Sequence, residues 1–248
     1  MGWTLPFENS NAVLGGSPAL GGSEFDQVAT MTFHRRPALL VYGAAMGFLE
    51  AAVVVYLRDL YYPGGFSFPL VPMDPRHVAI EAAREAATLV MILAVAWAAA
   101  GSLWQVLIGF ALAFGVWDLV YYAGLKVLLD WPASVLDSDV LFLIPSLWIG
   151  PVWAPAVIAL SMGAAAWLLW PLPYRAVSPR RWETASLVAA GVVLLATFLV
   201  PPARAGVTAL DSGSPLGEQA YPWWAWIAGE GSAVVIAWRW WRRGRTAV

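Results

Sequence analysis

Cysteine is absent from the sequence, and histidine occurs only twice, at His34 and His77. The missing cysteine excludes disulfides, thiolate metal sites and cysteine nucleophiles. Two histidines exclude a three-histidine metal site within this chain. A single hard cation held by Glu50, Glu81, Glu85 and Asp118 is compatible with the ligand types, but Arg84 among them argues against it, so no metal and no cofactor is predicted.

Charge is also scarce. Only 12% of the 248 residues are Asp, Glu, Lys or Arg, whereas 60% are hydrophobic. A soluble domain carries about 25% charged residues, so too few are present to cover a surface that faces water. The basic residues lie in small groups beside apolar runs, which gives nucleic-acid binding no support. The composition predicts an integral membrane protein whose main partner is the lipid bilayer.

Motifs for hydrolysis are missing as well. The sequence contains no G-x-S-x-G element, no H-E-x-x-H helix and no P-loop. It also lacks the Glu-x-x-His pairs of carboxylate-bridged di-metal sites, since the order is His77-x-x-x-Glu81. These absences argue against an enzyme, and no catalytic residue can be named.

What the sequence has is a series of long apolar runs, each near the ~20 residues that cross a bilayer. Helices are the expected form, because lipid cannot satisfy exposed backbone groups. The fold class predicted is all-α, a polytopic bundle of six transmembrane helices. Their approximate ranges are 38–60, 76–99, 103–126, 147–170, 182–200 and 221–241.

Residues 1–36 are polar and rich in Gly and Ser, and they are predicted to form a flexible cytoplasmic tail before the membrane domain 37–248. Met31 is a second possible start of the chain. Pro201-Pro202 are expected to end the fifth span. Pro and Gly residues between 145 and 155 suggest a broken or re-entrant entry into the fourth span.

The positive-inside rule favours both termini in the cytoplasm of a bacterial-type inner membrane. With that orientation the outer side receives only Arg58, Arg76, Lys126 and Arg204. The inner side receives Arg35, Arg36, Arg175, Arg180, Arg181, Arg239, Arg242, Arg243 and Arg245.

The second span carries a polar stripe. His77, Glu81, Arg84, Glu85 and Thr88 fall at i, i+4, i+7, i+8 and i+11 on an otherwise apolar helix. At 100° per residue they occupy a stripe about 100° wide, which must face water or other helices.

Other ionisable residues are expected at a similar depth in the outer half of the bundle. Glu50 lies near the middle of the first span, and Glu230 near the middle of the sixth. Asp118 lies in the outer half of the third span. The predicted intramembrane polar network comprises Glu50, His77, Glu81, Arg84, Glu85, Asp118, Tyr122 and Glu230.

An unpaired charge at the bilayer centre costs roughly 2.5–3.5 kcal/mol on insertion scales. We therefore predict that Arg84 pairs with an acid on a different helix. Gly43 and Gly47 form a small-residue face that should pack on a neighbouring helix. A network of this kind either forms a working site or only fixes helix packing, and the sequence supports both interpretations.

Three functions are compatible with these features. The first is an accessory or scaffold subunit of a larger membrane complex, such as an energy-converting one, with other membrane subunits as partners. The second is a small proton- or cation-coupled carrier that uses the polar network. The third is an intramembrane enzyme with a buried acid acting on a lipid or isoprenoid.

Overall fold

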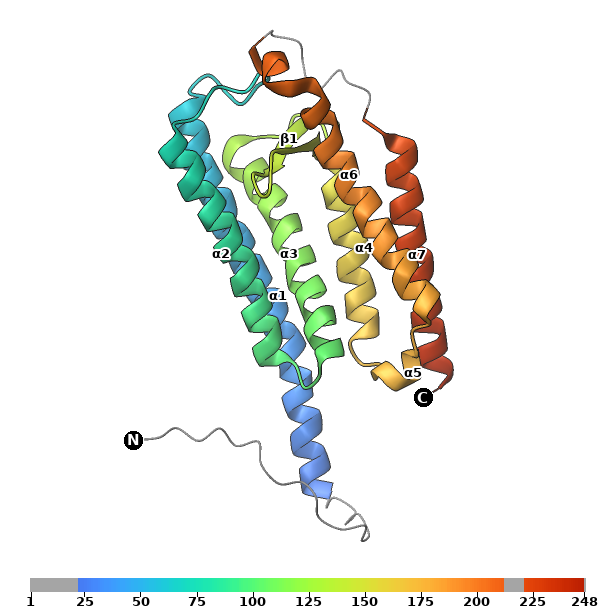
Figure 1. The fold of residues 1–248 in the computed structure, drawn as a ribbon. Coiled ribbons are helices and arrows are strands. Elements are labelled where there is room, and N and C mark those ends of the chain that lie inside the picture. The colour runs from blue at the N-terminus through green and yellow to red at the C-terminus, as the bar shows by residue number, and fades with distance from the viewer. Residues whose placement is uncertain (1–21, 212–220, 248) are drawn as a thin grey trace, which may run out of the picture. The chain divides into compact units, whose positions relative to one another are not determined.

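The computed structural model describes residues 22–211 and 221–247, with side chains for 35–203 and 221–247. Most of these residues are helical, and the long helices lie alongside one another (Figure 1). The elements are α1 (Gly22–Tyr61), α2 (Pro75–Ala99), α3 (Leu103–Leu129), β1 (Ser138–Phe142), β2 (Trp148–Pro151), α4 (Trp153–Leu169), α5 (Tyr174–Val177), α6 (Arg181–Asp211) and α7 (Trp223–Thr246).

The chain divides into two compact units, Met1–Arg35 and Arg36–Val248. In the first unit, α1 begins at Gly22, so residues 22–36, predicted as part of a flexible tail, are helical in the structure. After Gly22 this segment contains no glycine or proline, which removes the strongest helix breakers. The remainder of the predicted tail, residues 1–21, lies outside the described residues.

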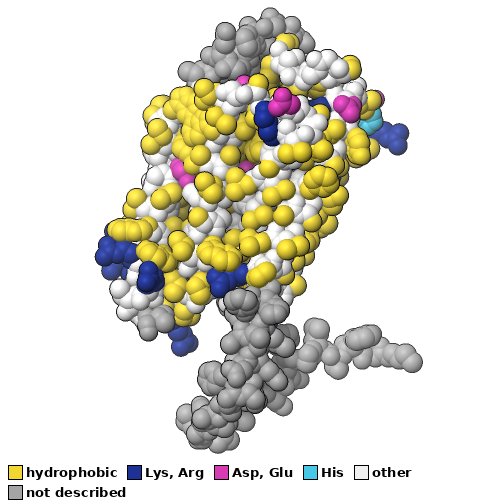
Figure 2. Space-filling view, turned by 180° about the vertical axis from the view of Figure 1, so that it is seen from behind, with side chains coloured by type: hydrophobic (Ala, Val, Ile, Leu, Met, Phe, Trp, Pro, Cys, Tyr) yellow, Lys and Arg dark blue, Asp and Glu magenta, His cyan; other side chains and the backbone are white. Residues whose placement is uncertain are grey.

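Three helical segments in the described ranges are long and apolar enough to cross a membrane: Arg35–Tyr61, Leu103–Leu129 and Arg181–Ala203. Helix α4 is apolar but shorter. Helices α2 and α7, also predicted as spans, contain several charged residues, in the first half of α2 and mainly in the last turns of α7. Hydrophobic side chains cover much of the visible face of the bundle (Figure 2). The chain is therefore a mostly helical membrane protein.

Helix α1 packs closely against α3 through its small-residue face. A Cβ atom on Gly43 would lie 2.6 Å from the backbone oxygen of Ala113, and one on Gly47 would meet the backbone oxygen of Trp117 in the same way. The prediction that this face packs on another helix is confirmed. Such an approach is possible only because glycine lacks a side chain.

The fourth predicted span, 147–170, is wrong at its beginning. Residues Trp148–Pro151 form strand β2, which pairs antiparallel with β1, and the helix begins at Trp153. Pro145 and Pro151 are unsuited to a helix interior, and the backbone of this stretch bonds to a second strand instead. The hairpin lies near the end of the bundle at which α2 begins (Figure 1).

The predicted end of the fifth span is also wrong. Helix α6 contains Pro201 and Pro202 and continues to Asp211. Each proline lacks a backbone N–H and therefore removes one helical hydrogen bond, but its fixed φ is compatible with a helix.

Candidate functional site

A cavity of about 760 Å³ opens among α1, α2, α3, the hairpin, α4 and α6. Most of its lining is apolar, but ionisable groups project into it from three helices and one strand. These groups are Glu50, Arg58, Glu81, Arg84, Glu85, Asp118 and Asp139. The cavity thus holds five carboxyl groups and two guanidinium groups.

Arg84 joins α2 to α1. Its guanidinium forms ion pairs with Glu50 of α1 and with Glu81, one turn away on its own helix. The Nε of Arg84 donates to Glu81 Oε2 at 2.9 Å. The prediction that Arg84 pairs with an acid on a different helix is confirmed, and the pair lies along the predicted stripe of α2.

Glu85 fixes the tip of the hairpin. The backbone N–H of Leu143 donates to both of its carboxylate oxygens, at 3.1 and 2.9 Å. Glu85 is ten residues beyond the start of α2, which corresponds to about 15 Å along the helix axis. The hairpin therefore extends well along α2, and one of its unpaired backbone donors is satisfied by an acid of the helical stripe.

Arg58 and Asp139 form a second ion pair, which the sequence did not predict. Arg58 Nη2 donates to Asp139 Oδ1 at 3.1 Å, and both side chains are buried. The guanidinium carbon lies 3.8 Å from the ring centre of Trp131 and 4.3 Å from that of Phe66. Burial raises the pKa of Asp139 to about 6, while Arg58 opposes that rise.

Sequence reasoning missed this pair because Arg58 was counted with the outer side of the membrane and Asp139 lies between the third and fourth predicted spans. One signal was available. The apolar run Val140-Leu141-Phe142-Leu143 follows directly after Asp139. Four consecutive large apolar residues indicate a buried segment rather than an exposed loop.

Asp118 and Tyr122 line the cavity from α3 without a hydrogen-bonding partner. The Oδ2 of Asp118 and the hydroxyl of Tyr122 are buried and unpaired in the described part of the chain. Buried polar atoms rarely remain unpaired, because each costs about 1–3 kcal/mol.

Unpaired polar atoms are concentrated around this cavity. Of the buried side-chain atoms without a hydrogen bond among the described residues, five belong to its lining, and the other two are the Nε1 atoms of Trp170 and Trp226. The five are Arg58 Nη1, Trp117 Nε1, Asp118 Oδ2, Tyr122 Oη and Trp148 Nε1. Because each of these atoms has almost no exposed surface, a bound molecule or water reaches it only where the lining side chains move apart.

Two residues of the predicted network lie elsewhere. His77 does not line the cavity; its Nδ1 is 2.5 Å from the hydroxyl of Tyr61. Glu230 of α7 accepts a hydrogen bond from Ser161 of α4 at 2.5 Å and is also absent from the lining. His77 lies in the first turn of α2, where it meets Tyr61. Glu230 projects from α7 towards Ser161 of α4, so similar depth does not bring these two side chains to the other six.

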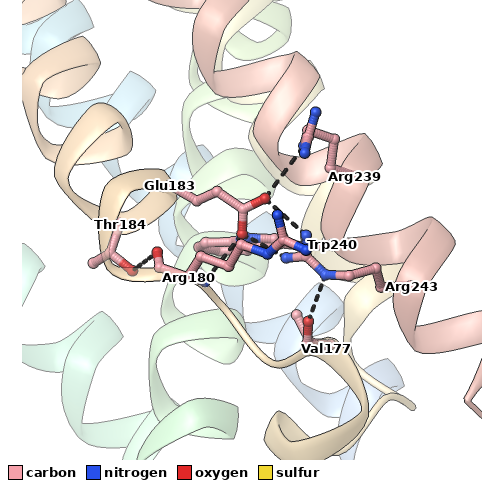
Figure 3. Close-up of polar contacts among 7 residues, drawn as sticks. All are labelled: Val177, Arg180, Glu183, Thr184, Arg239, Trp240 and Arg243. Carbon is pink, nitrogen blue, oxygen red and sulfur yellow. Dashed lines mark hydrogen bonds and ion pairs between the residues drawn. The ribbon is translucent and has the colours of Figure 1, made fainter.

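A second polar cluster ties the beginning of α6 to the end of α7 (Figure 3). Glu183 has no exposed side-chain surface, and its two oxygens accept from Arg243 at 2.7 and 2.5 Å. Further donors are Arg239 Nε, Trp240 Nε1 and the backbone N–H of Arg180, at 3.0–3.2 Å. Because this carboxylate is fully satisfied within the chain, the cluster is structural.

Within the described ranges, no group of three or more His, Asp or Glu side chains is placed to hold a metal ion. In comparisons with protein-family models, curated proteins and solved structures, nothing matches this chain.

Proposed function

We propose that this protein is a small membrane carrier that exchanges protons for a cation in the cavity between α1, α2, α3 and the hairpin. One observation carries the proposal: the cavity combines an excess of carboxyl groups with a cluster of unpaired polar atoms.

The excess of acid favours a cation as the ligand. Arg84 is shared by Glu50 and Glu81, and Arg58 balances Asp139. Glu85 has only a backbone donor, and Asp118 has no hydrogen bond with a described residue. Carboxylates in apolar surroundings need a proton or a counter-ion, so an incoming cation and a proton would compete for the same oxygens.

The cavity favours a carrier over the accessory-subunit and enzyme hypotheses. A scaffold subunit has no need for a cavity of this size with unpaired polar atoms on its walls. For an enzyme, the described residues offer a buried acid but no accompanying nucleophile or base in a recognised arrangement.

We further propose that α1, α2, α3, α4, α6 and α7 all cross a bacterial-type inner membrane, with both termini in the cytoplasm. The Arg-rich ends of α6 and α7 support this orientation, since they meet at the Glu183 cluster and place several guanidinium groups at one end of the bundle. The cavity then opens towards the outer half of the membrane.

The carrier proposal predicts cation-driven proton flux. In proteoliposomes with a trapped pH-sensitive dye, a panel of inorganic and organic cations is added outside, and proton efflux is recorded. Wild-type protein should respond to at least one cation. Asp118→Asn and Glu85→Gln should each reduce the rate about tenfold or more, since each removes an exchangeable carboxyl group.

Glu230→Gln is the matched control, because Glu230 is a buried helical acid outside the cavity. It should retain the wild-type rate. Absence of flux with every cation, together with co-purification at fixed stoichiometry with other membrane proteins, would contradict the carrier proposal and support the accessory-subunit hypothesis.

A further inference from the structure

The wall of the cavity beside Asp118 is aromatic. Along α3, the rings of Trp117 and Tyr121 are stacked with centres 6.5 Å apart, and those of Tyr121 and Tyr122 meet edge to face at 4.9 Å. Across from them, the hairpin adds Phe142, whose ring centre is 6.1 Å from that of Trp117. All four residues line the cavity, so Asp118 shares this part of the lining with several aromatic side chains.

We infer that the ligand is an organic cation, whose ammonium group pairs with Asp118 while its apolar body lies against these aromatic rings. This inference rests on the proposed function, since it names the class of cation that the carrier exchanges for protons.

Asp118 is the acid that most needs such a partner. It is buried, and its Oδ2 has no hydrogen bond within the described residues. The other carboxyl groups of the cavity each contact Arg84, Arg58 or the backbone of Leu143. A ligand cation would supply the missing charge, and the rings of Trp117 and Tyr121 would add cation–π attraction.

The same chemistry already occurs in the lining of the cavity. Arg58 is an internal cation that pairs with a buried carboxylate and lies over two aromatic rings, those of Phe66 and Trp131. This fold thus already contains a buried carboxylate whose cationic partner lies over aromatic rings. At Asp118 the carboxylate and the rings are present, and no cation from the described residues pairs with it.

The remaining unpaired atoms add a second requirement. Trp117 Nε1, Trp148 Nε1 and Arg58 Nη1 are donors, and none of the three can accept a hydrogen bond. A ligand that satisfies them must carry an acceptor, such as an ether, carbonyl or hydroxyl oxygen. A volume of about 760 Å³ lies in the range of roughly 300–1,000 Å³ that is usual for drug-sized organic ligands.

Choline phenyl ether combines these features, because it has a quaternary ammonium group, an ether oxygen and a phenyl ring. Its neutral carbon isostere is 3,3-dimethylbutyl phenyl ether, and phenoxyacetate is an anion of related shape. Binding of all three is measured by equilibrium dialysis against the full-length protein in lipid nanodiscs, with empty nanodiscs to correct for partition into lipid.

The cation should bind wild-type protein about tenfold to a hundredfold more tightly than the neutral isostere, as expected for a desolvated charge that gains an ionic partner and cation–π contacts. Asp118→Asn should remove most of that difference, Trp148→Phe should weaken binding a few-fold, and Glu230→Gln should bind as wild type does. The comparison of the two ethers needs no variant, so it holds even where a substitution impairs folding.

Equal binding of the neutral ether or of the anion would overturn the inference, as would no binding of the cation or undiminished binding by a folded Asp118→Asn protein. In each case the carrier proposal would still be judged by its own proton-flux measurement. Conversely, tight binding of choline phenyl ether without proton flux for any cation would support the ligand class and reject the carrier.

Discussion

Replacing Arg84 by methionine is expected to lower the free energy of unfolding by about 3 kcal/mol, at the low end of the range for breaking a buried ion pair. The change leaves Glu50 and Glu81 facing each other without their shared cation. The loss is moderated because one of the two carboxyl groups can take up a proton. The measurement is the unfolding equilibrium in mixed micelles, followed by far-ultraviolet circular dichroism.

Arg76→Met is the matched control, because Arg76 is exposed in the first turn of the same helix and should change stability little. Adding Glu50→Gln and Glu81→Gln to the Arg84→Met protein should restore most of the lost stability, since the uncompensated carboxylates are then gone. If Arg84→Met were as stable as Arg76→Met, the ion pairs would not hold α1 and α2 together.

Glu183→Ala is also expected to lower the free energy of unfolding by about 3 kcal/mol, because it leaves several donors without their acceptor. Arg239 and Arg243 are partly exposed and can turn towards water, but Trp240 Nε1 is buried and cannot. The substitution should therefore loosen the ends of α6 and α7. Unfolding equilibria together with hydrogen exchange of the backbone near Arg180 would measure both effects.

Thr184→Ala serves as the neighbouring control. Thr184 is exposed and contacts only the backbone oxygen of Arg180 within the cluster (Figure 3). The substitution should therefore lower the free energy of unfolding only slightly. In a double-mutant cycle, Glu183→Ala and Arg243→Met should show a coupling of about 1–3 kcal/mol. Additive losses would mean that the ion pair is not a stabilising contact.

Periodicity and the cost of buried charge were enough to predict much of the candidate site. The spacing from Glu81 to Thr88 identified the inward face of α2, and the need to neutralise Arg84 predicted its partner on α1. Gly43 and Gly47 likewise marked the face of α1 that meets α3. Each of these predictions depends on one helix and its immediate surroundings, which local sequence encodes.

The parts that escaped prediction depend on long-range placement. Asp139 reaches the cavity because a hairpin turns back along α2, and no local pattern fixes that position. Glu230 matched the other acids in depth, but rotation about α7 directs it to Ser161. Glu183 resembled an ordinary acid at a helix start, and only the docking of α7 makes it a buried anchor.

The exchange of a proton for a cation at Asp118 can be measured in purified wild-type protein. In weakly buffered detergent solution, choline phenyl ether is added to the protein, and the protons released to the medium are titrated. We predict release of about one proton for each cation bound, because the ligand displaces the proton that occupies the carboxyl group, and no release from Asp118→Asn. Cation binding without proton release, or equal release from Asp118→Asn, would contradict proton exchange at this residue.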